Sequence, residues 1–142
     1  MVPPRIHNRI MRPARPLLSR QQKTLSVGSE FATQVAVMAW ARQNVRRIPE
    51  LRWLHSSLNG AYMPPGVARK QKAAGMVAGI WDLFLPCSNH VYTGLYLEMK
   101  HGKNKLTEEQ IEFGTFVESQ GYKTAVAYSF EEATKVIEEY FS

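Results

Sequence analysis

Three charged side chains lie within two apolar runs of this sequence, and they constrain the fold more than any other feature. Asp82 lies inside the run Gly-Ile-Trp-Asp-Leu-Phe-Leu, and Glu98 and Lys100 end the run Gly-Leu-Tyr-Leu-Glu-Met-Lys. An ionised group buried among apolar residues is costly unless it is paired or binds a metal ion. The chain must therefore fold so that these charges compensate one another or share a cation.

The two runs predict paired strands over about residues 79–85 and 93–100. Side chains alternate faces along a strand, so Glu98 and Lys100 project to the same side. A symmetric antiparallel hairpin would place Asp82 opposite Glu98. Like charges directly opposite destabilise a sheet, so this pairing favours a hard cation such as Mg²⁺ between the carboxylates, with Lys100 beside the reacting group. A structural Asp82 bonded to backbone amides, and a Glu98–Lys100 ion pair, are the alternatives.

Composition predicts one domain with an uneven charge distribution. The 142 residues, 44% of them hydrophobic, suit a single core of ordinary size. Residues 1–72 contain 13 Lys and Arg against 2 acids, whereas residues 73–142 contain 5 against 10. The basic half is expected to attract phosphates, although a solvated basic surface without a specific partner would have the same composition.

Cysteine content and hydropathy predict a soluble protein of a reducing cytoplasm. A single cysteine, Cys87, allows no intrachain disulfide and no cysteine-based zinc site. No apolar run approaches the roughly 20 residues that cross a bilayer, and no secretory signal is evident. The Arg-rich, acid-free N-terminus leaves a mitochondrial transit peptide as an alternative. The chain has no glycine-rich phosphate loop, which argues against a nucleotide cofactor.

The N-terminal third predicts a basic arm and then a helix. Residues 1–28 contain six basic residues and no acid, and are expected to form a mobile arm outside the domain of residues 29–142. Ser29 is expected to cap a helix over about residues 30–44. Its Glu30 is interpreted, from the residues alone, as a first-turn acid favoured by the helix dipole. The buried face of that helix is expected to contain Phe31, Val35, Met38 and Ala39.

The rest of the chain alternates between strand and helix patterns. The expected elements are a strand over 51–58, a turn at 59–60, a basic helix ending near residue 75, helices over 107–120 and 129–140, and a strand over 123–128. Strands joined through a helical crossover should be parallel. Gln110 lies on the inward stripe of its helix and also in a capping box, so a structural and a functional role are both open.

The spacing of Asp82, Glu98, Lys100 and Gln110 resembles the PD-(D/E)XK nuclease superfamily and, more closely, its VRR-NUC family. The likeness extends over residues 29–36 (SEFATQVA), 58–60 (LNG), 75–83 (GMVAGIWDL), 94–100 (GLYLEMK) and 121–122 (GY). One departure is Trp81, which stands where the family usually has proline. Proline shapes the backbone there and supplies no ligand.

The resemblance implies an α/β fold with a restriction-endonuclease-like mixed sheet flanked by helices. It also implies a Mg²⁺- or Mn²⁺-dependent endonuclease in which Glu30, Asp82, Glu98 and the Met99 carbonyl surround the metal. Lys100 would position or activate water, and Gln110 would complete the site. Stand-alone members are similar to homodimeric Holliday-junction resolvases, so a homodimer and branched DNA are expected. The DNA contacts expected in the basic segments are Arg69, Lys70, Lys72, Lys103 and Lys105. The alternative is an inactive DNA- or RNA-binding module with the same basic surface.

Overall fold

The computed structural model describes residues 20–58 and 63–142, and for residues 20–28 it describes the backbone alone. The elements in chain order are α1 (Arg20–Gln43), the 3₁₀ helix η1 (Pro49–Trp53), β1 (His55–Ser56), α2 (Pro65–Ala73), β2 (Leu83–Leu85), β3 (Leu95–Met99), α3 (Glu108–Ser119), β4 (Lys123–Ala127) and α4 (Phe130–Phe141).

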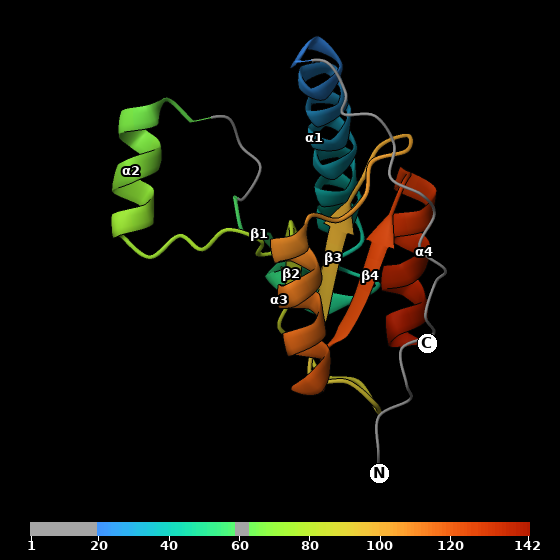
Figure 1. Ribbon diagram of the computed structural model, residues 1–142. Helices are drawn as coiled ribbons and strands as arrows, with labels where there is room; N and C mark the ends of the chain where they lie inside the picture. The colour runs from blue at the N-terminus through green and yellow to red at the C-terminus, as the bar shows by residue number, and fades with distance from the viewer. Residues whose placement is uncertain (1–19, 59–62) are drawn as a thin grey trace.

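The four strands form one mixed sheet in the order β1-β2-β3-β4 (Figure 1). The first two pairings are antiparallel, and β3 and β4 are parallel, as the crossover through α3 predicts. Leu83 pairs with Leu97 and Leu85 with Leu95, which is the symmetric hairpin register expected from the sequence. Continued by one residue, this register brings Asp82 opposite Glu98.

Helices cover both faces of the sheet. One face contains buried leucines of β2 and β3 and packs against α1 and α4, through residues such as Val37 and Ile137. The other face contains the stacked rings of Phe84 and Tyr96, and Phe113 of α3 contacts Tyr96 edge-on. Figure 1 shows α3 on the side of the sheet opposite α1 and α4. The α/β fold with flanking helices is therefore confirmed.

The start of α1 differs from the expectation. Ser29 does not cap the helix, because α1 already begins at Arg20 and the Ser29 carbonyl accepts a hydrogen bond from the Thr33 hydroxyl at 3.0 Å. Residues 20–28 contain no proline, so nothing in the covalent backbone stops the helix there. The backbone of residues 20–28 is helical, and residues 1–19 of the expected arm lie outside the described residues.

The predicted apolar face of α1 was wrong in part. Phe31 and Val35 are 60% and 51% exposed, whereas Met38 packs against the core and Val37 and Ala41 are fully buried. The helix is apolar on more than one side, so its periodicity does not specify a single face. Packing against α4 selects the stripe that includes the small Ala41, which lets the two helices approach closely.

Two strand predictions were too long. The segment expected as a strand over 51–58 forms η1, which Pro49 starts, followed by the two-residue strand β1. The strand expected over 79–85 is shortened to β2, and the turn predicted at 59–60 lies outside the described residues. The basic helix, the two C-terminal helices and β4 occur within one or two residues of their expected bounds.

Candidate active site

Asp82 and Glu98 face each other where β2 begins and β3 ends. The Asp82 amide donates a hydrogen bond to Glu98 Oε2 at 3.1 Å, and the Met99 amide donates to Asp82 Oδ2 at 2.9 Å. Each carboxylate thus accepts a hydrogen bond from the backbone of the opposite segment. These reciprocal bonds fix both carboxylates without neutralising their charge. The structural alternative for Asp82, a hydrogen bond from a backbone amide, is therefore also observed.

Lys100 and Gln110 both contact the same oxygen of Glu98. Lys100 Nζ lies 3.0 Å from Glu98 Oε1, and Gln110 Nε2 donates to that oxygen at 2.6 Å. The Glu98 side chain is 2% exposed and Lys100 is 9% exposed. The Glu98–Lys100 ion pair weighed from the sequence therefore exists, but it is buried and is shared with a third polar group.

Gln110 has two structural contacts at once. Its Oε1 accepts from the Thr107 amide at 2.9 Å while the Gln110 amide donates to Thr107 Oγ1 at 3.2 Å, which is the capping box of α3. Because this box uses Oε1 as an acceptor, Nε2 is oriented toward Glu98. The capping and inward roles that the sequence left open are therefore compatible, and the start of α3 is coupled to the carboxylate.

Glu30 lies at the edge of this cluster. Its Oε1 accepts from the His101 amide at 3.1 Å and from Asn104 Nδ2 at 2.8 Å, so α1 is joined to the loop after β3. The backbone carbonyl of Asn104 in turn accepts from the Tyr128 hydroxyl at 3.0 Å. Sequence reasoning missed Asn104, because it is 74 residues from Glu30 and reads locally as a turn asparagine.

Burial raises the pKa of both central carboxyls. Burial raises the pKa of Asp82 to about 6; the Met99 amide and the Lys100 ammonium lower it, and Glu30 adds to the rise. Burial and then the charge of Asp82 raise the pKa of Glu98 to about 7, against the opposing effect of Lys100. One ammonium thus acts on two carboxylates that are largely removed from water, and the charge of Glu30 acts on Asp82 as well. The site has an excess of negative charge that a cation would compensate.

The donor set fits a hard divalent cation. Asp82 and Glu98 supply oxygen ligands on a rigid pair of strands, and Mg²⁺ commonly binds one or two carboxylates while it keeps several waters. Glu30 is held by His101 and Asn104 rather than against the other two carboxylates. Accordingly, residues 20–58 and 63–142 contain no group of three or more His, Cys, Asp or Glu arranged as metal ligands. The cluster suits a cation that is held by two carboxylates and completed by water or main-chain oxygen.

Trp81 packs between the sheet and α3, next to the candidate site. Its indole Nε1 donates to the Gln110 carbonyl at 2.8 Å, and the ring is 3% exposed. Gly114 lies against this ring so closely that an added Cβ would come within 2.7 Å of an indole carbon. The residue that replaces the family proline therefore packs α3 onto the sheet next to Asp82. Its role as a contact of α3 was not evident from the sequence.

The basic residues expected to contact DNA are exposed but lie in two separate segments. Arg69, Lys70 and Lys72 are in α2, and Lys103 and Lys105 are in the loop that also contains Asn104. Figure 1 shows α2 set apart from the sheet and its covering helices. The structure thus places one basic segment beside the carboxylate cluster and the other on a projecting helix.

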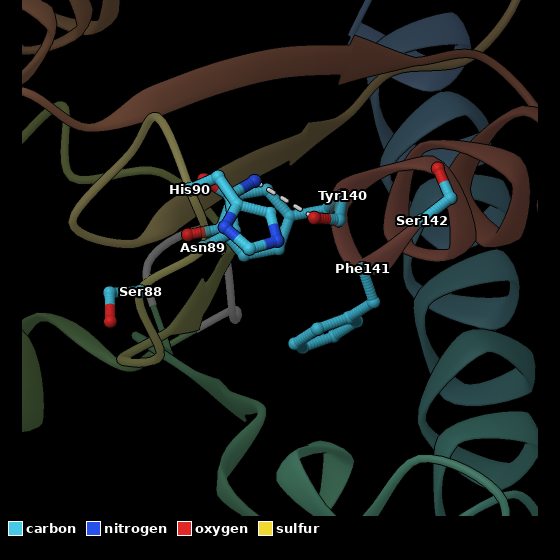
Figure 2. Close-up of a pocket in the computed structure, with 6 residues that line it drawn as sticks. All are labelled: Ser88, Asn89, His90, Tyr140, Phe141 and Ser142. Atoms are coloured by element: carbon cyan, nitrogen blue, oxygen red, sulfur yellow. Dashed lines mark hydrogen bonds between the residues drawn. The ribbon is translucent and has the colours of Figure 1, made fainter.

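A cavity of about 270 Å³ lies at the opposite end of the sheet, near the connection from β2 to β3. Figure 2 shows the Asn89 amide hydrogen-bonded to the Tyr140 carbonyl, at 2.8 Å. The lining residues are Ser88, Asn89, His90, Tyr140, Phe141 and Ser142. None of them belongs to the carboxylate cluster, and their side chains include no carboxylate.

Comparison with known proteins agrees with this fold. A solved structure described as a VRR_NUC domain protein superposes with a TM-score of 0.62 and 29% identity, covering 78% of this chain and 86% of the other. The chain is thus similar, over most of its length, to a member of the VRR-NUC family. No family model matches the sequence, and neither does any curated protein.

The likeness to a VRR_NUC domain protein points to the nuclease domains, a class of hydrolases. Such domains generally use divalent metal ions, which agrees with the negative surplus of the cluster. Among the described helices, none has the length and apolar character needed to cross a membrane.

Proposed function

We propose that this protein is a metal-dependent endonuclease that hydrolyses phosphodiester bonds in branched DNA. The observation that carries the proposal is the buried cluster in which Asp82 and Glu98 oppose each other beside Lys100. Such a concentration of buried negative charge destabilises a fold unless a cation compensates it. Perturbed carboxyl pKa values are also typical of functional sites. The VRR-NUC neighbour supports the same chemistry.

Asp82 and Glu98 would hold Mg²⁺ or Mn²⁺, with Met99 contributing its carbonyl and Glu30 acting through water. The ion would supply positive charge against the negative charge that develops on the scissile phosphate. The protein's own contribution is orientation. The Met99 amide fixes Asp82, and Gln110 and Lys100 fix Glu98, so neither carboxylate has to reorganise during the reaction.

Lys100 is proposed to act on water or on a phosphate oxygen. An ammonium has three donors, and the contact with Glu98 Oε1 uses one of them. The remaining donors can hold the attacking water or stabilise the transition state. Gln110 completes the site indirectly, because its Oε1 is used in the cap of α3 and its Nε2 is used on Glu98.

Branched DNA and a homodimer are proposed on the resemblance to resolvase-like stand-alone members of the family. The test uses labelled linear duplex, flap and four-way-junction DNAs incubated with Mg²⁺, Mn²⁺ or EDTA. We expect metal-dependent cleavage that is fastest on the branched substrates, by a species that sediments as a dimer. Binding of DNA without cleavage in the presence of either Mg²⁺ or Mn²⁺ would instead support an inactive nucleic-acid-binding module. Preferential binding of an RNA competitor would support an RNA-directed module.

A further inference from the structure

Helix α2 is not packed onto the rest of the fold. Its nine residues, Pro65–Ala73, include none that is buried, and within the described part of the chain no other helix or strand packs extensively against it. Figure 1 shows it projecting to one side of the sheet. A helix this short is only marginally stable alone in water, so packing against the described residues does not explain its presence.

The charges of α2 are of one sign and on one side. Arg69, Lys70 and Lys72 are all exposed, the helix contains no acid, and among the described residues none of the three forms a salt bridge. At about 100° per residue these three side chains fall within one half of the helix circumference. Val67 falls on the other half. This arrangement is complementary to a row of phosphates and gives little apolar area for a protein partner.

The base of α2 is fixed beside the candidate active site. The chain leaves α2 at Ala74 and reaches Gly79, whose φ is +87° and where an added Cβ would come within 2.6 Å of the Glu109 backbone in α3. Two residues later Trp81 is hydrogen-bonded to Gln110. The segment from Gly79 to Asp82 is therefore held against the start of α3, and α2 extends from that anchor.

The length of the connection limits where α2 can reach. About ten residues separate Lys72 from Asp82, and fully extended they span at most ~35 Å. That distance corresponds to about ten nucleotide steps along one strand of B-form DNA. Cations on α2 are therefore within about one helical turn of a phosphate that lies at Asp82.

We propose that α2 is a phosphate-binding arm that holds the backbone of the DNA duplex within one turn of the bond that is cut. The proposal rests on the proposed function and names the surface that holds its substrate. Contacts of Lys and Arg with phosphate are independent of base sequence. The arm therefore contributes affinity and register along the duplex, whereas the carboxylate cluster performs the reaction.

The test compares two triple variants that remove the same charge. Arg69→Gln/Lys70→Gln/Lys72→Gln neutralises the arm, and Arg42→Gln/Arg46→Gln/Lys135→Gln neutralises three exposed cations of the α1 and α4 side. Binding to a 30-base-pair duplex and to a four-way junction is measured by fluorescence anisotropy in EDTA, over a range of salt concentrations. Thermal unfolding of both variants is measured as well, and the arm variant should melt as the wild type does, because α2 buries no residue.

Counterion release sets the expected size of the effect. Loss of three phosphate contacts should reduce the slope of log K against log salt by about 2.7 and weaken binding roughly 100-fold at 0.15 M salt. The control variant should lose only a small part of this. Equal losses in the two variants would mean that net charge alone attracts DNA and would overturn the proposal, as would a salt slope of the arm variant equal to that of the wild type.

The outcome can be separated from that of the nuclease proposal. Binding in EDTA does not depend on catalysis. If the arm variant binds DNA more weakly but the wild type never cleaves DNA, the arm proposal stands and the nuclease proposal fails. Conversely, if the wild type cleaves DNA and the arm variant binds DNA as the wild type does, the nuclease proposal stands and the arm proposal fails.

Discussion

Glu98 connects three segments of the candidate site. Its two oxygens accept from the Asp82 amide, Lys100 and Gln110, so one side chain joins β2, β3 and α3. This arrangement explains why a nearly fully buried carboxylate is tolerated with its pKa raised to about 7. It also means that the charge of Glu98 is costly to the folded state whenever no cation is bound.

The pH dependence of metal-free stability follows from that cost. Asp82 and Glu98 have folded-state pKa values of about 6 and about 7, above the ordinary values of 3.8 and 4.5. A raised carboxyl pKa gives stability that is full below the unfolded value and is lost as pH rises through the folded value. Glu98→Gln removes the part of this loss of stability that comes from ionisation of Glu98. In EDTA the variant should therefore have a melting temperature close to that of the wild type at pH 4 and higher than that of the wild type at pH 8.

The expected gain at pH 8 is about 1 to 3 kcal/mol, from the size of one pKa shift. It is measured by thermal unfolding from pH 4 to 8, with and without Mg²⁺. The ion should stabilise the wild type and leave Glu98→Gln nearly unchanged. A variant that is less stable than the wild type throughout this range would mean that the ion pair with Lys100 outweighs the repulsion.

At the scale of elements, α3 is positioned both by its apolar stripe, which includes Phe113 and Val117, and by close packing at Trp81. Trp81 supplies both a hydrogen bond to Gln110 and a ring surface against which only a glycine fits, at Gly114. The strand register was predictable, because the apolar runs are symmetric about their connection. The contacts of Trp81 and Asn104 were not, since they join residues 29 and 74 positions apart without any local pattern. The buried face of α1 was not predictable either, because Phe31 and Val37 are equally apolar and only packing distinguishes them.

Gly114→Ala tests the packing of α3. Glycine to alanine within a helix ordinarily stabilises by about 0.5 to 1 kcal/mol, but here the added Cβ would lie 2.7 Å from the indole ring. We expect destabilisation of about 1 to 3 kcal/mol, because overpacking displaces α3. The matched control is Gly66→Ala in α2, where no atom lies within 4 Å of the added Cβ and the change should be neutral or stabilising. Chemical denaturation measures both; equal effects at the two glycines would contradict the packing role of Trp81.

At the scale of the whole molecule, the candidate site is assembled from segments that are distant in the sequence. Glu30 of α1, the residues around β2 and β3, and Gln110 of α3 meet at one end of a four-stranded sheet. The sequence alone indicated the central pair and its register, and the resemblance added Glu30. The projecting position of α2 needed the tertiary structure, because a basic helix has the same sequence pattern whether it is packed or free. The negative charge of the carboxylate cluster and the positive charge of α2 therefore lie in separate parts of the molecule.

The central claim is that the opposed carboxylates of Asp82 and Glu98 make DNA cleavage dependent on a divalent ion. The most direct test is the single-turnover cleavage rate of a labelled four-way junction as Mg²⁺ is titrated, for wild type, Asp82→Asn and the exposed-acid control Glu112→Gln. Asparagine can still accept from the Met99 amide while it removes the charge, so the fold should be retained. We predict a saturable Mg²⁺ dependence for the wild type and the control, and a rate at least about 100-fold lower for Asp82→Asn, equivalent to about 2.7 kcal/mol. Cleavage by Asp82→Asn at close to the wild-type rate under saturating Mg²⁺ would contradict the account.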